Sequence, residues 1–246
     1  MNNPTFIQWS VLLSVFGALL AGCSTMPKIA PQASFLSDKG SIGIIWVAKT
    51  AQQKGEFYKE GSQMLGDLAI SQGLADASDL MKRIRQEELK SEVKKRYTEL
   101  FKSAFEAKGF TVKAVDECYI RGKLPEFNTP SGGKEGEFAE YDYTSIAREL
   151  GVDKLSVLDV RAFGISRAFY GFVPTGSPRG YSQLSVALVE GKSNRLLGLY
   201  PLTAMTKNCE GDWNQPPEFA HLVKAMDKSM EDAVDEAFVL FFKQAP

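Results

Sequence analysis

The sequence predicts a single α+β domain in which helices flank a mixed β-sheet of about four to five strands. Its 246 residues are 44% hydrophobic and 24% charged, which is an ordinary globular composition. Apolar runs typical of strands alternate with stretches of helical periodicity. Their order is strand, helix, strand, helix, strand, strand, strand, helix. We therefore expect residues 41–246 to fold as one unit with helices covering the sheet.

The first half of this domain contains one strand and a long helical region. Residues 41–47 are a short run of β-forming apolar residues, which predicts a central strand. Apolar residues between two glycines predict a small helix over 61–73, and a longer helical stretch covers 74–108. Gly109 follows as a helix-ending glycine. The expected buried face of the long stretch consists of Val93, Tyr97, Leu100, Phe101, Ala104 and Phe105, spaced three and four apart.

Two further strands and a short helix are expected in the middle of the chain. Residues 110–115 alternate with a period of two and predict the second strand. Residues 118–141, rich in proline and glycine, predict a long loop. Asp142 is a candidate cap for a helix over 143–150. An apolar third strand over 154–166 follows this helix.

The last third predicts a β-hairpin and a final helix. Strands over 181–189 and 195–202 flank a turn at 191–194. An apolar stripe at helical spacing then predicts a helix reaching the C-terminus. The stripe comprises Phe219, Leu222, Val223, Met226, Met230, Ala233, Val234, Ala237 and Phe241.

The N-terminal segment resembles the signal of bacterial lipoproteins. Residues 1–22 carry no charged side chain and contain an apolar run too short to span a bilayer. They end in Leu20-Ala21-Gly22-Cys23, which resembles a lipobox. The resemblance implies a signal peptide over 1–22, acylation of Cys23, and a flexible tether over 23–40. Ser24 in place of Asp implies sorting to the outer membrane. The alternative is an uncleaved anchor or a buried first helix.

Two segments of the expected domain resemble a known superfamily of envelope proteins. They are the helix-to-strand step over 143–155 and the hairpin over 184–197. Both are similar to the superfamily that contains the TolB N-terminal domain, the curli-export lipoprotein and the penicillin-binding-protein activator lipoproteins. The resemblance implies a periplasm-facing, non-catalytic adaptor that binds another envelope protein or itself. A subunit of an oligomeric secretion complex and a carrier lipoprotein of an envelope transporter are the alternatives.

Cys118 and Cys209 remain once Cys23 is assigned to lipidation. Both are expected in loops of a protein in an oxidising compartment, where disulfides form. A disulfide between them is one expectation, and two separate buried thiols are the other.

The segment over 168–181 is the expected partner-binding surface, because it combines aromatic residues with glycine and proline. Exposed aromatics beside an arginine are typical of interface hot spots. The candidates are Phe169, Tyr170, Phe172, Arg179 and Tyr181. The alternative is that the aromatic rings fold back onto the sheet edge. Met64, Leu65, Leu68 and Ile70 form a second candidate contact surface, with a core role as the alternative.

The remaining motifs predict no enzyme, cofactor or metal. The 29 basic and 30 acidic residues leave a formal charge of −1, which does not favour nucleic acid as a partner. Ser91 and Lys94 have the spacing of one hydrolase motif but lack its companion motifs. His221 is expected to be a solvated or packing histidine on a surface helix, because the sequence offers it no triad partners.

Overall fold

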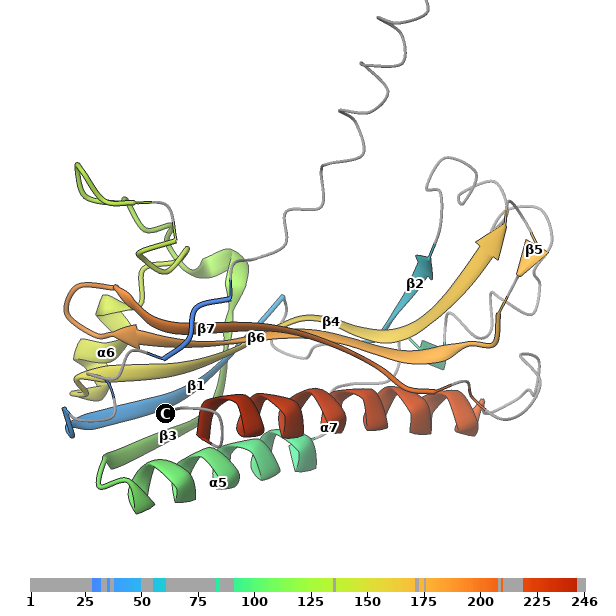
Figure 1. Cartoon of the computed structure of the whole chain (residues 1–246), viewed down its shortest axis with the longest axis horizontal. Coiled ribbons are helices and arrows are strands. Elements are labelled where there is room, and N and C mark those ends of the chain that lie inside the picture. The colour runs from blue at the N-terminus through green and yellow to red at the C-terminus, as the bar shows by residue number, and fades with distance from the viewer. Residues whose placement is uncertain are drawn as a thin grey trace, which may run out of the picture.

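A mixed β-sheet forms the centre of the computed structural model (Figure 1). The structure describes residues 28–31, 35, 38–49, 55–60, 83–84, 91–134, 136–170, 173–174, 176–207, 209 and 219–242. The elements are β1 (Ser41–Ala48), β2 (Glu56–Glu60), α5 (Ser91–Ala107), β3 (Thr111–Ile120), the 3-10 helix η2 (Arg121–Lys123), α6 (Thr144–Leu150), β4 (Lys154–Tyr170), β5 (Val173–Pro174), β6 (Arg179–Glu190), β7 (Leu196–Met205) and α7 (Ala220–Phe242). The α+β class and the mixed sheet are confirmed.

The strand order along the sheet is β3-β1-β4-β6-β7. β3, β1 and β4 are parallel to one another. β6 is antiparallel to both of its neighbours, β4 and β7. β1 pairs with the first part of β4, up to Val160, and β2 pairs in parallel with its later part, from Gly164 to Ala168. β1 and β2 therefore follow each other along the same edge of β4. β4 is the central strand of the sheet, because it pairs with β1, β2, β5 and β6.

Helices α5 and α7 lie side by side on one face of the sheet (Figure 1). The predicted stripe of α5 is the centre of the core there, with Tyr97, Phe101 and Phe105 fully buried. The ring of Phe101 lies 4.1 Å from that of Tyr97, and 5.3 to 6.0 Å from three rings near the end of α7. Those three rings belong to Phe238, Phe241 and Phe242. Spacings of this size are typical of interlocked aromatic rings.

The approach of α7 to β6 depends on small residues. A methyl group at Gly180 would lie 1.9 Å from the carbonyl oxygen of Ala225, so only glycine fits at this crossing. One turn further along α7, the hydroxyl of Ser229 lies 2.6 Å from that of Ser182, and both side chains are fully buried. The hydrogen bond satisfies two polar groups that burial would otherwise penalise.

Helix α6 and the segment before it cover the opposite face at the other end of the sheet. Asn194, in the turn between β6 and β7, is fully buried at a φ of 61°. Its side-chain oxygen accepts from the amide of Tyr143, and its nitrogen donates to the carbonyls of Ala139 and Tyr141. The turn thus holds the covering segment against the sheet. Gly151 ends α6 at a φ of 61°, a left-handed conformation that glycine adopts readily.

The structure corrects several boundaries. β3 continues to Ile120, so Cys118 lies in a strand and not in the expected loop. The polar residues Asp116 and Glu117 lie in an irregularity of the register, and the strand then resumes with Cys118, Tyr119 and Ile120. These three residues pair with Trp46, Val47 and Ala48 of β1. β4 extends to Tyr170 because β2, a strand missed in the sequence, pairs with its later part. The expected helix over 61–73 lies outside the described residues.

The domain also begins before residue 41, within the expected tether. Ile29 and Leu199 exchange two backbone hydrogen bonds of 2.8 Å at the edge of β7. Phe35 is buried and stacks on Phe110 with ring centres 5.3 Å apart. Asp38 forms a 2.9 Å ion pair with the buried Lys154. These contacts fix part of the segment over 23–40 to the sheet.

Candidate functional site

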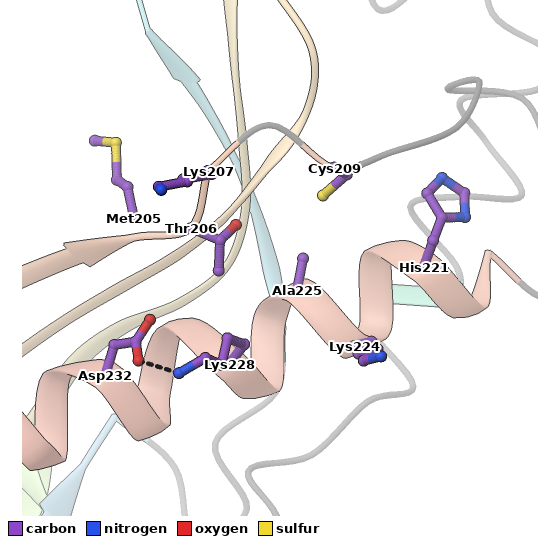
Figure 2. Close-up of a pocket in the computed structure, with 9 residues that line it drawn as sticks. All are labelled: Met205, Thr206, Lys207, Cys209, His221, Lys224, Ala225, Lys228 and Asp232. Atoms are coloured by element: carbon purple, nitrogen blue, oxygen red, sulfur yellow. Dashed lines mark hydrogen bonds and ion pairs between the residues drawn. The ribbon is translucent and has the colours of Figure 1, made fainter.

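A groove of about 720 Å³ lies between the end of β7 and the first half of α7 (Figure 2). Backbone contacts hold the strand end in place: the amide of Thr206 donates to the carbonyl of Gly180 at 3.0 Å, and the amide of Cys209 donates to the carbonyl of Pro178 at 3.1 Å. The lining residues are Met205, Thr206, Lys207, Cys209, His221, Lys224, Ala225, Lys228 and Asp232. Helix α7 packs against both β6 and β7. The end of β7 and the first half of α7 therefore lie close enough to line one groove.

Lysine is the most frequent charged residue in the described lining of the groove. Among these described residues, three are lysines and one, Asp232, is acidic. Asp232 forms an ion pair with Lys228, and this hydrogen bond raises the pKa of the Lys228 ammonium (Figure 2). Lys207 and Lys224 are exposed and form no ion pair within the described part of the chain. Two lysines of the lining thus have no carboxylate partner among the residues that the structure describes.

Cys209 and His221 line the same groove, which the sequence analysis missed because twelve positions separate them. Their side chains do not form a nucleophilic pair. Burial raises the pKa of the Cys209 thiol, so the neutral form is favoured over the reactive thiolate. The Nε2 atom of His221 is buried and has no hydrogen-bond partner among the described residues. Figure 2 shows the imidazole and the thiol on different elements, without a hydrogen bond between them.

Cys118 and Cys209 are both free thiols in the structure. Cys118 lies opposite Trp46, which in turn lies opposite Leu158 of β4. The amide of Cys209 donates a hydrogen bond to the carbonyl of Pro178, two positions before Gly180. Gly180 in turn pairs with Ile165 of β4. Leu158 and Ile165 are seven residue steps apart on β4, which corresponds to about 23 Å along the strand. Because a disulfide requires Cα atoms within about 7 Å, this geometry does not bring the two thiols together.

The aromatic candidate surface lies at the far end of β4 (Figure 1). The backbones of Phe169 and Tyr170 pair with Pro174 and Val173 of β5, so the expected loop is largely strand. Tyr181 lies on β6 between Gly164 and Met205, and Arg179 pairs with Ser166. Both of these side chains are half-buried. Phe172 lies outside the described residues.

A buried ion-pair cluster on β4 is a second feature that the sequence analysis missed. Asp159 is 7% exposed and accepts a hydrogen bond from Nε of Arg121 at 3.1 Å. Arg161 lies 3.1 Å from both Asp159 and Glu140. Burial raises the pKa of the Asp159 carboxyl, while the two arginines act in the opposite direction. The four charges balance, so the cluster fastens η2 and the segment before α6 to the sheet. The sequence feature that indicates this cluster is Asp159, an acidic residue within the apolar run of β4.

Other predicted sites fall outside the described residues. Cys23 and the apolar group Met64, Leu65, Leu68 and Ile70 are among them. No helix within the described ranges has the length and apolar character needed to cross a membrane. Among the same residues, no group of three or more metal-ligating side chains is placed to hold a metal ion.

Comparison with known proteins gives structural neighbours and no sequence relatives. No protein-family model matches the chain, and no curated protein matches it. Protein XCC0632 from Xanthomonas campestris, described with the family model DUF330, is 10% identical, with 88% of this chain and 91% of that chain covered and a TM-score of 0.39. The PelC dodecamer from Paraburkholderia phytofirmans is 8% identical, with 85% and 92% covered and a TM-score of 0.28. The hypothetical protein CT253 from Chlamydia trachomatis is 9% identical, with 85% and 99% covered and a TM-score of 0.34. Likenesses at this level assign neither a family nor a function to the chain, and the resemblance to the TolB-containing superfamily stays a prediction.

Proposed function

We propose that this protein is a bacterial outer-membrane lipoprotein whose periplasmic α+β domain is a non-catalytic interaction module of an envelope assembly. The observation that carries the proposal is the segment Leu20-Ala21-Gly22-Cys23, which follows an uncharged apolar run. Acyl chains on Cys23 would hold the protein at the membrane, because each buried CH₂ contributes about 0.8 kcal/mol. Ile29, six positions after Cys23, is paired with Leu199 of β7.

The chemistry of the described side chains supports a binding role. The buried charges around Asp159 are paired with one another and fasten covering segments to the sheet. Cys209 and His221 share a groove, but the thiol is held neutral and is not hydrogen-bonded to the imidazole. Nucleophilic catalysis requires a nucleophile within hydrogen-bond reach of its base. The groove is therefore better suited to binding than to catalysis.

The partner-binding surface in this proposal is the far end of β4 and β6. Phe169 and Tyr170 are the last residues of β4, and Arg179 and Tyr181 belong to the first part of β6. Phe172 lies between these strands in the sequence. Pairing with β5 places Phe169 and Tyr170 beyond the part of β4 that β1 covers. Aromatic side chains beside an arginine are over-represented among residues that dominate binding energy. The partner is another envelope protein or a second copy of this chain.

Replacement of Cys23 by alanine is expected to abolish lipidation. The variant lacks the thiol that would receive the diacylglycerol, so it should incorporate no labelled palmitate and should leave the membrane fraction or remain unprocessed. Metabolic labelling and membrane fractionation in cells measure both results. Cys209→Ala is the matched control, since it removes a thiol outside the lipobox and should leave labelling unchanged. Equal labelling of wild type and Cys23→Ala would contradict the anchor.

Alanine at Phe169, Tyr170 and Phe172 together is expected to remove the partner without unfolding the domain. Crosslinking of the natively lipidated protein in cells, followed by mass spectrometry, identifies the adducts of wild type and variant. The expected result is one dominant adduct that falls at least about tenfold in the variant. Phe127→Ala, in the segment before α6, is the control for loss of an aromatic ring elsewhere. Undiminished adducts in the triple variant would rule out this surface, and a ladder of self-adducts would identify the partner as a second copy.

A further inference from the structure

The groove between β7 and α7 combines an apolar floor with a cationic mouth. Its volume of about 720 Å³ falls within the range of about 300–1,000 Å³ that is usual for small-molecule sites. Ala225 and the neutral Cys209 thiol contribute apolar surface to the lining. Met205 is 42% exposed and stands at the strand end of the same lining. A flexible methionine at this place can adapt to an apolar ligand.

The charges of the groove select an anion as ligand. Asp232 is already paired with Lys228, so it does not neutralise the other two lysines. Lys207 reaches the groove from the strand side and Lys224 from the helix side (Figure 2). His221 adds an imidazole whose Nε2 atom is buried and has no partner within the described residues. An acidic head group would therefore meet cations from two elements and one unused polar atom.

We propose that this groove binds a single-chain anionic lipid. Its carboxylate head lies between Lys207 and Lys224, and its acyl chain lies along Ala225, Cys209 and Met205. An inorganic anion would satisfy the lysines but leave the apolar floor open to water. A neutral lipid would leave the two cations without a partner among the described residues. A carboxylate lipid satisfies both parts of the lining. This inference depends neither on the anchor at Cys23 nor on a protein partner.

Photocrosslinking of the full-length protein in phosphatidylcholine vesicles tests the proposal. The probe is a laurate that carries a photoactivatable diazirine on its chain, and mass spectrometry locates the labelled residues. We expect labelling to concentrate at the end of β7 and the start of α7. Neutralisation of both cations in Lys207→Gln/Lys224→Gln should reduce it at least about tenfold, since each charged hydrogen bond contributes appreciably to affinity. Lys123→Gln, on η2, is the matched control and should label like wild type.

Four results would overturn the proposal. The first is equal labelling by an alkyl trimethylammonium probe of the same chain length, which would show that the lysines do not select the head group. The second is unchanged labelling in the double variant. The third is complete competition by inorganic phosphate, which would show that the site recognises an anion alone. The fourth is labelling spread over the surface only in anionic vesicles, which would indicate contact with a membrane surface. Because the experiment uses isolated protein, its failure leaves the cellular tests of the anchor and partner intact.

Discussion

Replacement of Phe101 by alanine is expected to lower the free energy of unfolding by about 3–5 kcal/mol. The side chain is fully buried on α5 and contacts rings from both α5 and α7. Its removal leaves a cavity that the surrounding rings cannot fill, because they are fixed by their own neighbours. Since a typical domain is stable by only about 5–15 kcal/mol, this single change removes a large part of the total.

Urea unfolding followed by circular dichroism measures the loss. Val239→Ala is the matched control, because Val239 is on α7 but is 37% exposed. The control should change the free energy of unfolding by no more than about 0.5 kcal/mol. A Phe101→Ala variant that loses less than about 1 kcal/mol would show that α5 and α7 do not share one core.

Replacement of Gly180 by alanine is expected to destabilise the domain by about 3 kcal/mol. The new methyl group would lie 1.9 Å from the Ala225 carbonyl oxygen, and a backbone atom cannot rotate away as a flexible side chain can. Helix α7 would have to move away from β6, which separates the Ser182 and Ser229 hydroxyls as well. The clash exceeds the gain of roughly 0.5–1 kcal/mol that alanine normally gives over glycine in a strand.

The same unfolding measurement tests this prediction with Gly122→Ala as control. A methyl group at Gly122, in η2, meets no atom within 4 Å, and this residue should tolerate alanine. If Gly180→Ala unfolds at the same urea concentration as wild type, then the close crossing of α7 and β6 is not formed in solution. Because the groove lies along this crossing, Gly180→Ala should also alter the labelling of the groove.

The parts of the fold that follow one clear period could be predicted from the sequence. The α5 stripe of Tyr97, Phe101 and Phe105 repeats every four residues, and the structure buries all three side chains. The C-terminal stripe likewise corresponds to α7. Both helices form because an apolar face is buried against the sheet, and the spacing of neighbouring residues in the sequence is enough to identify that face.

The missed elements depend on partners that are distant in the sequence. β2 is five residues long with glutamates at both ends, and it is a strand because β4 offers it a free edge. In β3, the polar residues Asp116 and Glu117 interrupt the apolar alternation, and the strand continues beyond them because Cys118 to Ile120 pair with β1. Backbone pairing does not require apolar side chains, so hydrophobic periodicity gives no signal for such strands.

The groove could not be predicted, because its lining comes from a strand end and a helix that are brought together by Gly180. His221 was expected to be solvated or packed, and the structure places its Nε2 atom in a buried position beside the groove. Lys207 and Lys224 are ordinary surface lysines when considered separately. That both line one groove is a property of the packing of α7 against the sheet and not of either segment.

The hydrogen bonds between Ile29 and Leu199 have a consequence for how the domain would stand on a membrane. Ile29 is held at the edge of β7, and six residue steps separate it from Cys23. A fully extended chain covers at most about 3.6 Å per residue, so an acylated Cys23 would keep this edge within about 22 Å of the bilayer. The β7 edge of the sheet would therefore stay near the lipid in any orientation of the domain. The same limit does not apply to β3, which lies at the other end of the strand order and could lie farther from the membrane.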